Sequence, residues 1–129
     1  MANGEAFKAF AQRRMFELIG PCGIHAHLGT GIRNIETCLK AIKEVLEFAR
    51  VLKRELDIDI RYFDFGGGFG VPTVKEFSVL DVKLRANNLP VRPLDIASCP
   101  VIADYGRAIA KLMNQYYTPT DPDVPTIIF

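Results

Sequence analysis

The sequence lacks an excess of charge of either sign, and this absence excludes two classes of partner. Its 129 residues hold 16 lysines and arginines against 15 aspartates and glutamates, which gives a formal net charge of +1. A nucleic-acid site or a polybasic lipid anchor needs clustered positive charge. We therefore expect the protein to bind neither nucleic acid nor a membrane surface.

Long apolar runs and paired cysteines are missing as well. No run approaches the about 20 residues of a membrane span, and the first sixteen residues carry Glu5, Lys8, Arg13 and Arg14 without an apolar signal core. This predicts a cytoplasmic protein. The odd number and unrelated spacings of Cys22, Cys38 and Cys99 fit no zinc or redox motif, so we expect reduced and mostly buried thiols.

What the sequence does contain is an alternation of helix and strand patterns. The clearest is a long amphipathic helix over 35–56, in which apolar side chains recur every three or four residues after a capping Asn34. A β-branched and aromatic run predicts a strand over 58–65. Weaker patterns predict a helix over 5–16, a strand over 22–28, a helix over 100–117 and the start of a strand at 126–129.

The segment 70–98 has no clean period. It contains "LPVRPLDIASCP", whose three prolines break regular structure. We expect an extended loop here, with some helix around 75–86.

The order of these patterns predicts an α/β fold of parallel βαβ units, in which ligands bind at the carboxyl ends of the strands. Two polar, glycine-containing segments fall at such ends, "HAHLGTG" at 25–31 and "DFGGGFG" at 64–70. Because the intervening helix makes their strands a parallel pair, we expect both segments at one edge of the sheet. The helix residues expected against the sheet are Leu39, Ile42, Leu46 and Ala49.

Gly66, Gly67 and Gly68 lack Cβ atoms, so their amides can approach an anion closely, as a phosphate site requires. A tight, flexible turn explains the same glycines equally well from local sequence. A dinucleotide fingerprint would need further glycines where Val71 or Thr73 stands, and no Gly-Lys-Ser/Thr P-loop is present. A nucleotide-binding domain is therefore disfavoured.

His25 and His27 stand two residues apart, so they share one face of the predicted strand, with Thr30 just past its end. A metal site would use both imidazoles, but no third ligand of the usual spacing is visible, and we expect no metal. For His25 we expect a packed and hydrogen-bonded side chain. For His27 an alternative is a flat ring stacked on a flat ligand.

Together the two segments carry a family resemblance. "GIHAHLGTG" followed by "FDFGGGFG" resembles the paired H-x-H-x-G-[S/T] and D-x-G-G-G motifs of the fold-type III pyridoxal-phosphate enzymes, the diaminopimelate and ornithine decarboxylase family. The resemblance implies that residues 1–129 are a fragment of the pyridoxal-phosphate-binding domain, a partial alanine-racemase-like (β/α)8 TIM barrel. The start of the barrel and the C-terminal β-domain would be absent.

The resemblance also implies roles for single residues. His27 would stack on the pyridine ring of pyridoxal 5'-phosphate, Thr30 would contact the cofactor phosphate, and Gly66, Gly67 and Gly68 would form its backbone cradle. The full-length protein would be a homodimer that removes the α-carboxylate of a small amino acid as CO₂.

No residue here matches a catalytic position of that family. The family's cofactor-binding lysine lies in a Lys-Ala-Asn motif that the sequence does not contain; "KLRANN", 83–88, has Arg85 instead, and a guanidinium cannot form that bond. The family's Glu-Pro-Gly-Arg motif would follow "TIIF", where the sequence stops. We expect this fragment alone to be inactive.

Three alternatives stay open. The first is a paralogue that binds the cofactor without catalysis, and the second is a racemase-type enzyme that uses the same cofactor. The third, from outside the family, is a βα protein that binds another phosphorylated metabolite through the same glycines.

Overall fold

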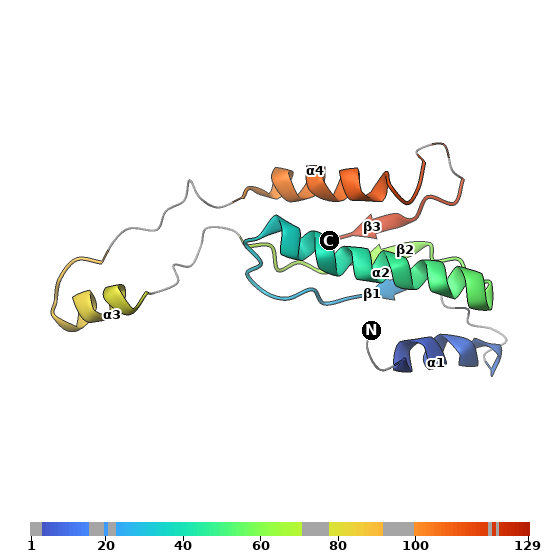
Figure 1. Cartoon of the computed structure of the whole chain (residues 1–129), viewed down its shortest axis with the longest axis horizontal. Coiled ribbons are helices and arrows are strands. Elements are labelled where there is room, and N and C mark those ends of the chain that lie inside the picture. Colours follow the sequence, from blue (N-terminus) through green and yellow to red (C-terminus); the bar gives the residue numbers. More distant parts are fainter. Residues whose placement is uncertain are drawn as a thin grey trace.

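The computed structural model describes residues 4–15, 20, 23–70, 78–91, 100–118, 120 and 122–129. Helices α2 and α4 lie side by side over a small sheet, α1 contacts α2, and α3 stands apart from this unit (Figure 1). In chain order the elements are α1 (Glu5–Ala11), the 3-10 helix η1 (Gln12–Met15), β1 (Gly23–His25), α2 (Ile35–Leu56), β2 (Tyr62–Asp64), α3 (Val79–Ala86), α4 (Ile102–Met113) and β3 (Thr126–Ile128).

The sheet has the strand order β1-β2-β3, and both pairs are parallel. In register, Ile24 lies beside Phe63 and Phe63 beside Ile127. These residues point to the helix layer, where Ile24 and Phe63 are buried and Ile127 packs against the core. The predicted α/β fold with parallel strands is confirmed.

The strands are shorter than predicted. The run 58–65 yields only β2, although Ile58 and Ile60 before it are buried and extend the core. β1 ends at His25 rather than at residue 28, yet the ladder continues through a 2.8 Å hydrogen bond from the Ala26 amide to the Asp64 carbonyl. A strand ends where its neighbour stops pairing, which is a property of the sheet and not of the local side chains.

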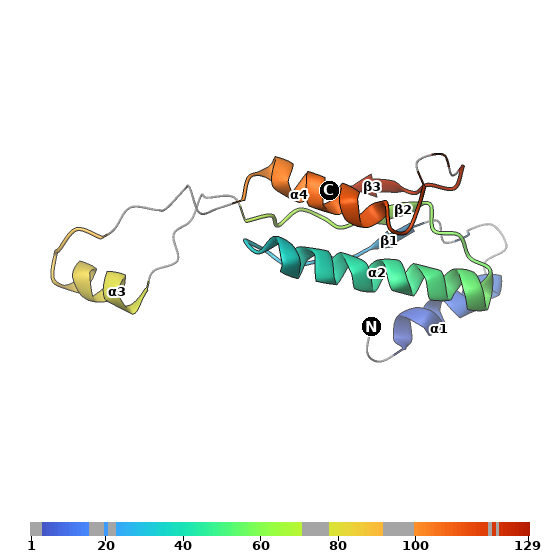
Figure 2. The same cartoon turned by 45° about the horizontal axis from the view of Figure 1, so that its top comes forward.

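Helix α2 has the predicted bounds. Its first turn is capped by Asn34, whose side-chain oxygen accepts a 3.1 Å hydrogen bond from the Thr37 amide. The helix runs alongside the sheet (Figure 2). Its buried face packs on the sheet, and the partly buried Leu39 joins it as expected. The buried residues of the helix are Cys38, Ile42, Val45, Leu46, Ala49 and Leu52.

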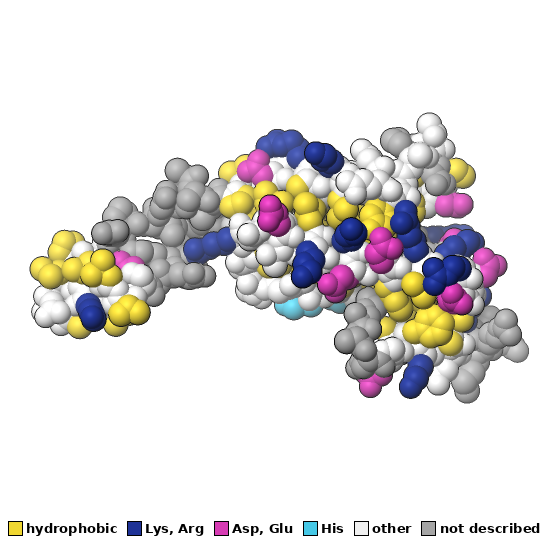
Figure 3. Space-filling model, viewed as in Figure 1, with side chains coloured by type: hydrophobic (Ala, Val, Ile, Leu, Met, Phe, Trp, Pro, Cys, Tyr) yellow, Lys and Arg dark blue, Asp and Glu magenta, His cyan; other side chains and the backbone are white. Residues whose placement is uncertain are grey.

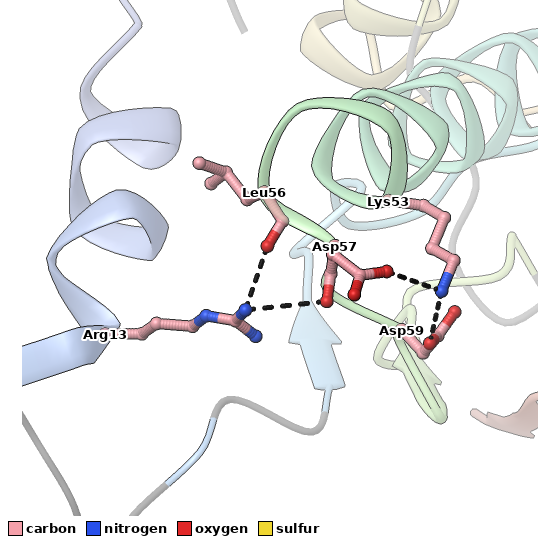
Figure 4. Close-up of polar contacts among 5 residues, drawn as sticks. All are labelled: Arg13, Lys53, Leu56, Asp57 and Asp59. Carbon is pink, nitrogen blue, oxygen red and sulfur yellow. Dashed lines mark hydrogen bonds and ion pairs between the residues drawn. The ribbon is translucent and has the colours of Figure 1, made fainter.

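The carboxyl end of α2 is closed by charged groups from two directions (Figure 4). Arg13 of η1 donates a 2.9 Å hydrogen bond to the Leu56 carbonyl, one of the groups that a helix leaves without an internal partner. Lys53 contacts Asp59 at 2.7 Å and Asp57 at 2.9 Å, and these hydrogen bonds hold the pKa of its ammonium above the usual value. Because this end of α2 lies away from the carboxyl ends of the strands, we assign these contacts to the stability of the fold.

Helix α4 also packs through one apolar face, with Tyr105, Ile109 and Leu112 buried. It ends at Met113, before the predicted residue 117, because the amides of residues 115 and 116 bond carbonyls three residues back and tighten the chain into turns. The helix begins at Ile102, so Pro100 precedes it rather than opening it.

Other differences from the predictions are local. The helix expected over 5–16 is α1 followed by η1, and the helix expected around 75–86 is α3, with much of the segment 70–98 outside the described residues. Cys38 is buried and free, and its burial raises the pKa of the thiol. Cys22 and Cys99 lie outside the described residues.

Within the described ranges, none of the helices combines the length and the apolar composition that a bilayer crossing demands.

Candidate functional site

The two glycine-containing segments meet where β1 and β2 end. Past the strands, the Ile32 amide donates a 2.9 Å hydrogen bond to the Gly68 carbonyl, and the Gly70 amide donates a 2.6 Å bond to the Ile32 carbonyl. Ile32 and Phe69 thereby form a parallel bridge. The segments 25–32 and 64–70 are therefore side by side at one edge of the sheet, as the sequence predicts.

The three consecutive glycines differ in backbone conformation and in the space around them. Gly68 has φ +83°, and a Cβ placed there would lie 2.0 Å from the carbonyl oxygen of Gly29 and 3.4 Å from the Cα of Thr30. Gly66 also lies in the left-handed region, with φ +61°. Gly68 is thus required for the close approach of the two segments.

Gly67 has no such packing role. It is exposed, its φ lies outside the left-handed region, and a Cβ placed there would meet no heavy atom of the described residues within 4 Å. Alanine would satisfy the backbone here. The bare backbone of Gly67 faces open space next to the segment that carries Thr30, which is itself exposed.

The histidines lie on the sheet face that no described helix covers. Ile24 is buried and Ala26 packs against the core, whereas His25 and His27 between and after them are exposed. This alternation puts both imidazoles on one face, as predicted. In the space-filling view, the histidine side chains reach the surface at the lower margin of the central unit (Figure 3).

His25 pairs with an aspartate from the neighbouring strand. Its Nδ1 lies 3.0 Å from Oδ2 of Asp64, and Oδ1 of Asp64 accepts a 2.8 Å hydrogen bond from the Gly66 amide. The Gly66 bond first, and His25 second, hold the pKa of Asp64 below its usual value. Asp64 thus ties the first glycine to β1.

The expectation for His25 is half confirmed. Its side chain is hydrogen-bonded, but it is 63% exposed and not packed, because the described residues place nothing over this face of the sheet. Asp64 was not predicted as a site residue. Its signal was present in the sequence, since an aspartate two residues before the first of three glycines can accept a hydrogen bond from that glycine's amide.

The pKa of Asp64 gives a testable pH dependence. Because the folded-state pKa is lowered, its contribution to stability is complete above the unfolded-state pKa of about 3.9 and is lost as the pH falls through the lower folded-state value. In the full-length protein, Asp64→Asn should lower the thermal midpoint at neutral pH. The difference from wild type should shrink below about pH 4.

Thermal unfolding of both proteins across this pH range measures the difference. Glu44→Gln, which neutralises an exposed carboxylate on α2, serves as the matched control. A difference between wild type and Asp64→Asn that stays constant through the acid range would contradict the assignment.

Among the described residues, no group of three or more histidine, cysteine, aspartate or glutamate side chains is placed to hold a metal ion. This edge of the sheet instead carries the exposed backbone of Gly67, the exposed Thr30 and two exposed imidazoles. Such a set suits an anionic group attached to a flat ring.

Similarity to known proteins identifies the family of the chain. Residues 2–111 match the family described as pyridoxal-dependent decarboxylase, pyridoxal binding domain. The diaminopimelate decarboxylase of Helicobacter pylori is 32% identical over 119 residues, which cover 88% of this chain and 27% of that protein. The enzyme of that name from Methanothermobacter thermautotrophicus is 36% identical over 69 residues, 54% of this chain and 16% of that protein.

A solved structure is also similar. The crystal structure of diaminopimelate decarboxylase from M. jannaschi superposes with a TM-score of 0.69 and 25% sequence identity, covering 97% of this chain and 24% of that chain. The present chain thus matches between 16% and 27% of the length of these relatives. Since the family match covers most of its residues, the chain belongs to the fold-type III pyridoxal-phosphate-dependent decarboxylases, whose cofactor is pyridoxal phosphate.

Proposed function

We propose that residues 1–129 form part of the cofactor-binding (β/α)8 barrel domain of an amino-acid decarboxylase and hold the phosphate and the ring of pyridoxal phosphate. The observation that carries the proposal is the bare backbone of Gly67, which faces open space although nothing in the described packing requires a glycine there. A cradle for a phosphate requires such a residue, because a Cβ would occupy the ligand's place.

The phosphate would be held by groups from both segments. The amides of Gly67 and Gly68 would donate hydrogen bonds to it, together with the hydroxyl of Thr30, and Gly66 would lead the chain into this position. A Cβ placed at Gly68 would lie 3.4 Å from the Cα of Thr30, so the two residues are close in space, which supports a common binding space. Hydrogen bonds from amides to an anion are shorter and stronger than neutral ones.

His27 would hold the ring. Both imidazoles are exposed on the same face, but His25 contacts Asp64, and His27 lies two residues closer to Thr30 in the sequence. Stacking of the imidazole on the pyridine ring would fix the plane of the cofactor. Pyridoxal phosphate, when bound, supplies an electron sink for the loss of the α-carboxylate of the substrate.

The barrel is supported by the parallel order of the three strands and by their exposed face. Opposite the helices, Tyr62 and Ile128 are 45% and 44% exposed, and a closed barrel would bury such residues. Further strands and the lysine that bonds the cofactor would come from outside this sequence. Because the similar proteins are named diaminopimelate decarboxylases, the proposed substrate is a diamino acid such as diaminopimelate. The proposed assembly is a homodimer.

The test is to express the full reading frame, record the absorbance of bound pyridoxal phosphate, and measure CO₂ release from diaminopimelate, ornithine and lysine. We expect cofactor absorbance and CO₂ release from at least one of them. Absorbance with inversion of the α-carbon but no CO₂ would indicate a racemase, and absorbance without either reaction would indicate a non-catalytic paralogue. A protein that retains no pyridoxal phosphate would contradict the proposal. The 129-residue chain alone should release no CO₂.

A further inference from the structure

One buried side chain from a distant helix reaches the pairing between the glycine segments. Tyr105 lies in the first turn of α4, is 2% exposed, and donates a 2.6 Å hydrogen bond from its hydroxyl to the Ile32 carbonyl. The same carbonyl accepts the 2.6 Å bond from the Gly70 amide. Both lone pairs of this oxygen are therefore used, one by each partner.

The ring of Tyr105 supports the same place from the helix side. Its ring centroid lies 4.9 Å from that of Phe69, the residue that forms the bridge with Ile32. The ring centroid of Phe69 lies in turn 5.6 Å from that of Phe129. Tyr105 and Ile32 are 73 residues apart in sequence. This contact joins α4 to the backbone that carries both halves of the proposed phosphate site.

Ile32 lies close to both segments of the proposed phosphate site, so its hydrogen bond with Tyr105 bears on the geometry of that site. Ile32 is two residues from Thr30, and its amide bonds the carbonyl of Gly68. A shift of Ile32 would therefore move Thr30 relative to the glycines. A rotation of the Ile32 carbonyl would therefore change the positions of both segments, 25–32 and 64–70.

We propose that Tyr105 is a positioning residue, whose hydroxyl fixes the spacing between the two segments that hold the cofactor phosphate. The inference rests on the proposed function. It adds a residue that touches neither the cofactor nor the substrate and acts through the carbonyl of Ile32.

The test uses Tyr105→Phe in the full-length protein, which removes the hydroxyl and keeps the ring. Loss of one net hydrogen bond should weaken binding of pyridoxal phosphate about three- to tenfold. Binding of pyridoxal, which has no phosphate, should change less than about twofold, because the ring contacts do not depend on the spacing of the segments. In the cofactor-free protein, amide hydrogen exchange of Gly70 and Ile32 should accelerate about three- to tenfold.

Tyr116→Phe is the matched control. Its hydroxyl donates a 2.5 Å hydrogen bond to Glu47 on α2, outside the site. It should leave both affinities and the exchange of Gly70 unchanged.

Equal weakening of pyridoxal and pyridoxal phosphate by Tyr105→Phe would overturn the inference, since the hydroxyl would then act on the whole fold. So would unchanged exchange at Gly70. If the wild type binds no pyridoxal phosphate but the exchange of Gly70 still accelerates in the variant, the proposed function fails while the mechanical role of Tyr105 stands.

Discussion

Gly67→Ala is expected to leave the fold of the full-length protein unchanged and to weaken binding of pyridoxal phosphate about 10- to 150-fold, the equivalent of one lost hydrogen bond to a charged group. The fold should tolerate the change because a Cβ at Gly67 meets nothing within 4 Å among the described residues, and the backbone there is not left-handed. The binding should not tolerate it, because the methyl group would enter the proposed phosphate space. Cofactor titration followed by absorbance, with circular dichroism of the same samples, measures both effects.

Gly68→Ala separates packing from binding. Here the Cβ would lie 2.0 Å from the Gly29 carbonyl oxygen, so the two segments must separate and the protein should lose stability as well as cofactor. Equal cofactor affinity in Gly67→Ala and wild type would show that the phosphate does not lie against this glycine.

His27→Ala in the full-length protein is expected to lower cofactor affinity about tenfold, through loss of a ring–ring contact and the area that it buries. The melting temperature without cofactor should change little, because the side chain is exposed and not part of the core. Equilibrium titration with pyridoxal phosphate and turnover with the preferred amino acid measure the effect.

His25→Ala is the matched control, since it removes an imidazole from the same face two residues earlier. It should reduce cofactor affinity less, because His25 contacts Asp64 and would reach the cofactor only through the Gly66 turn. A larger loss of cofactor affinity in His25→Ala than in His27→Ala would show that His25, and not His27, stacks on the ring.

Local patterns predict the parts of the fold that depend on local chemistry. The bounds of α2 could be predicted because the apolar period of 3.6 residues and the Asn34 cap both depend only on residues close together in the sequence. The parallel pairing of β1 and β2 follows from the length of the connecting helix. The meeting of the two glycine segments follows in turn, because parallel strands end at the same edge.

The contacts between distant residues could not be predicted in this way. The His25–Asp64 pair depends on the register that sets Gly23 beside Tyr62, and a slip of one residue would separate the two side chains onto opposite faces. Tyr105 lies within the helix predicted over 100–117, and it is buried. Its hydrogen bond to the Ile32 carbonyl depends on the position of α4 relative to the sheet, and local sequence patterns do not predict that position.

The central claim is that Gly67, Gly68 and Thr30 form a phosphate site at the edge shared by β1 and β2. A crystal structure of the full-length protein with pyridoxal phosphate tests it most directly. We predict the phosphate within about 3 Å of the Gly67 and Gly68 amides and of the Thr30 hydroxyl, with the ring against His27. A phosphate bound elsewhere, with the Gly67 amide facing solvent, would contradict the account.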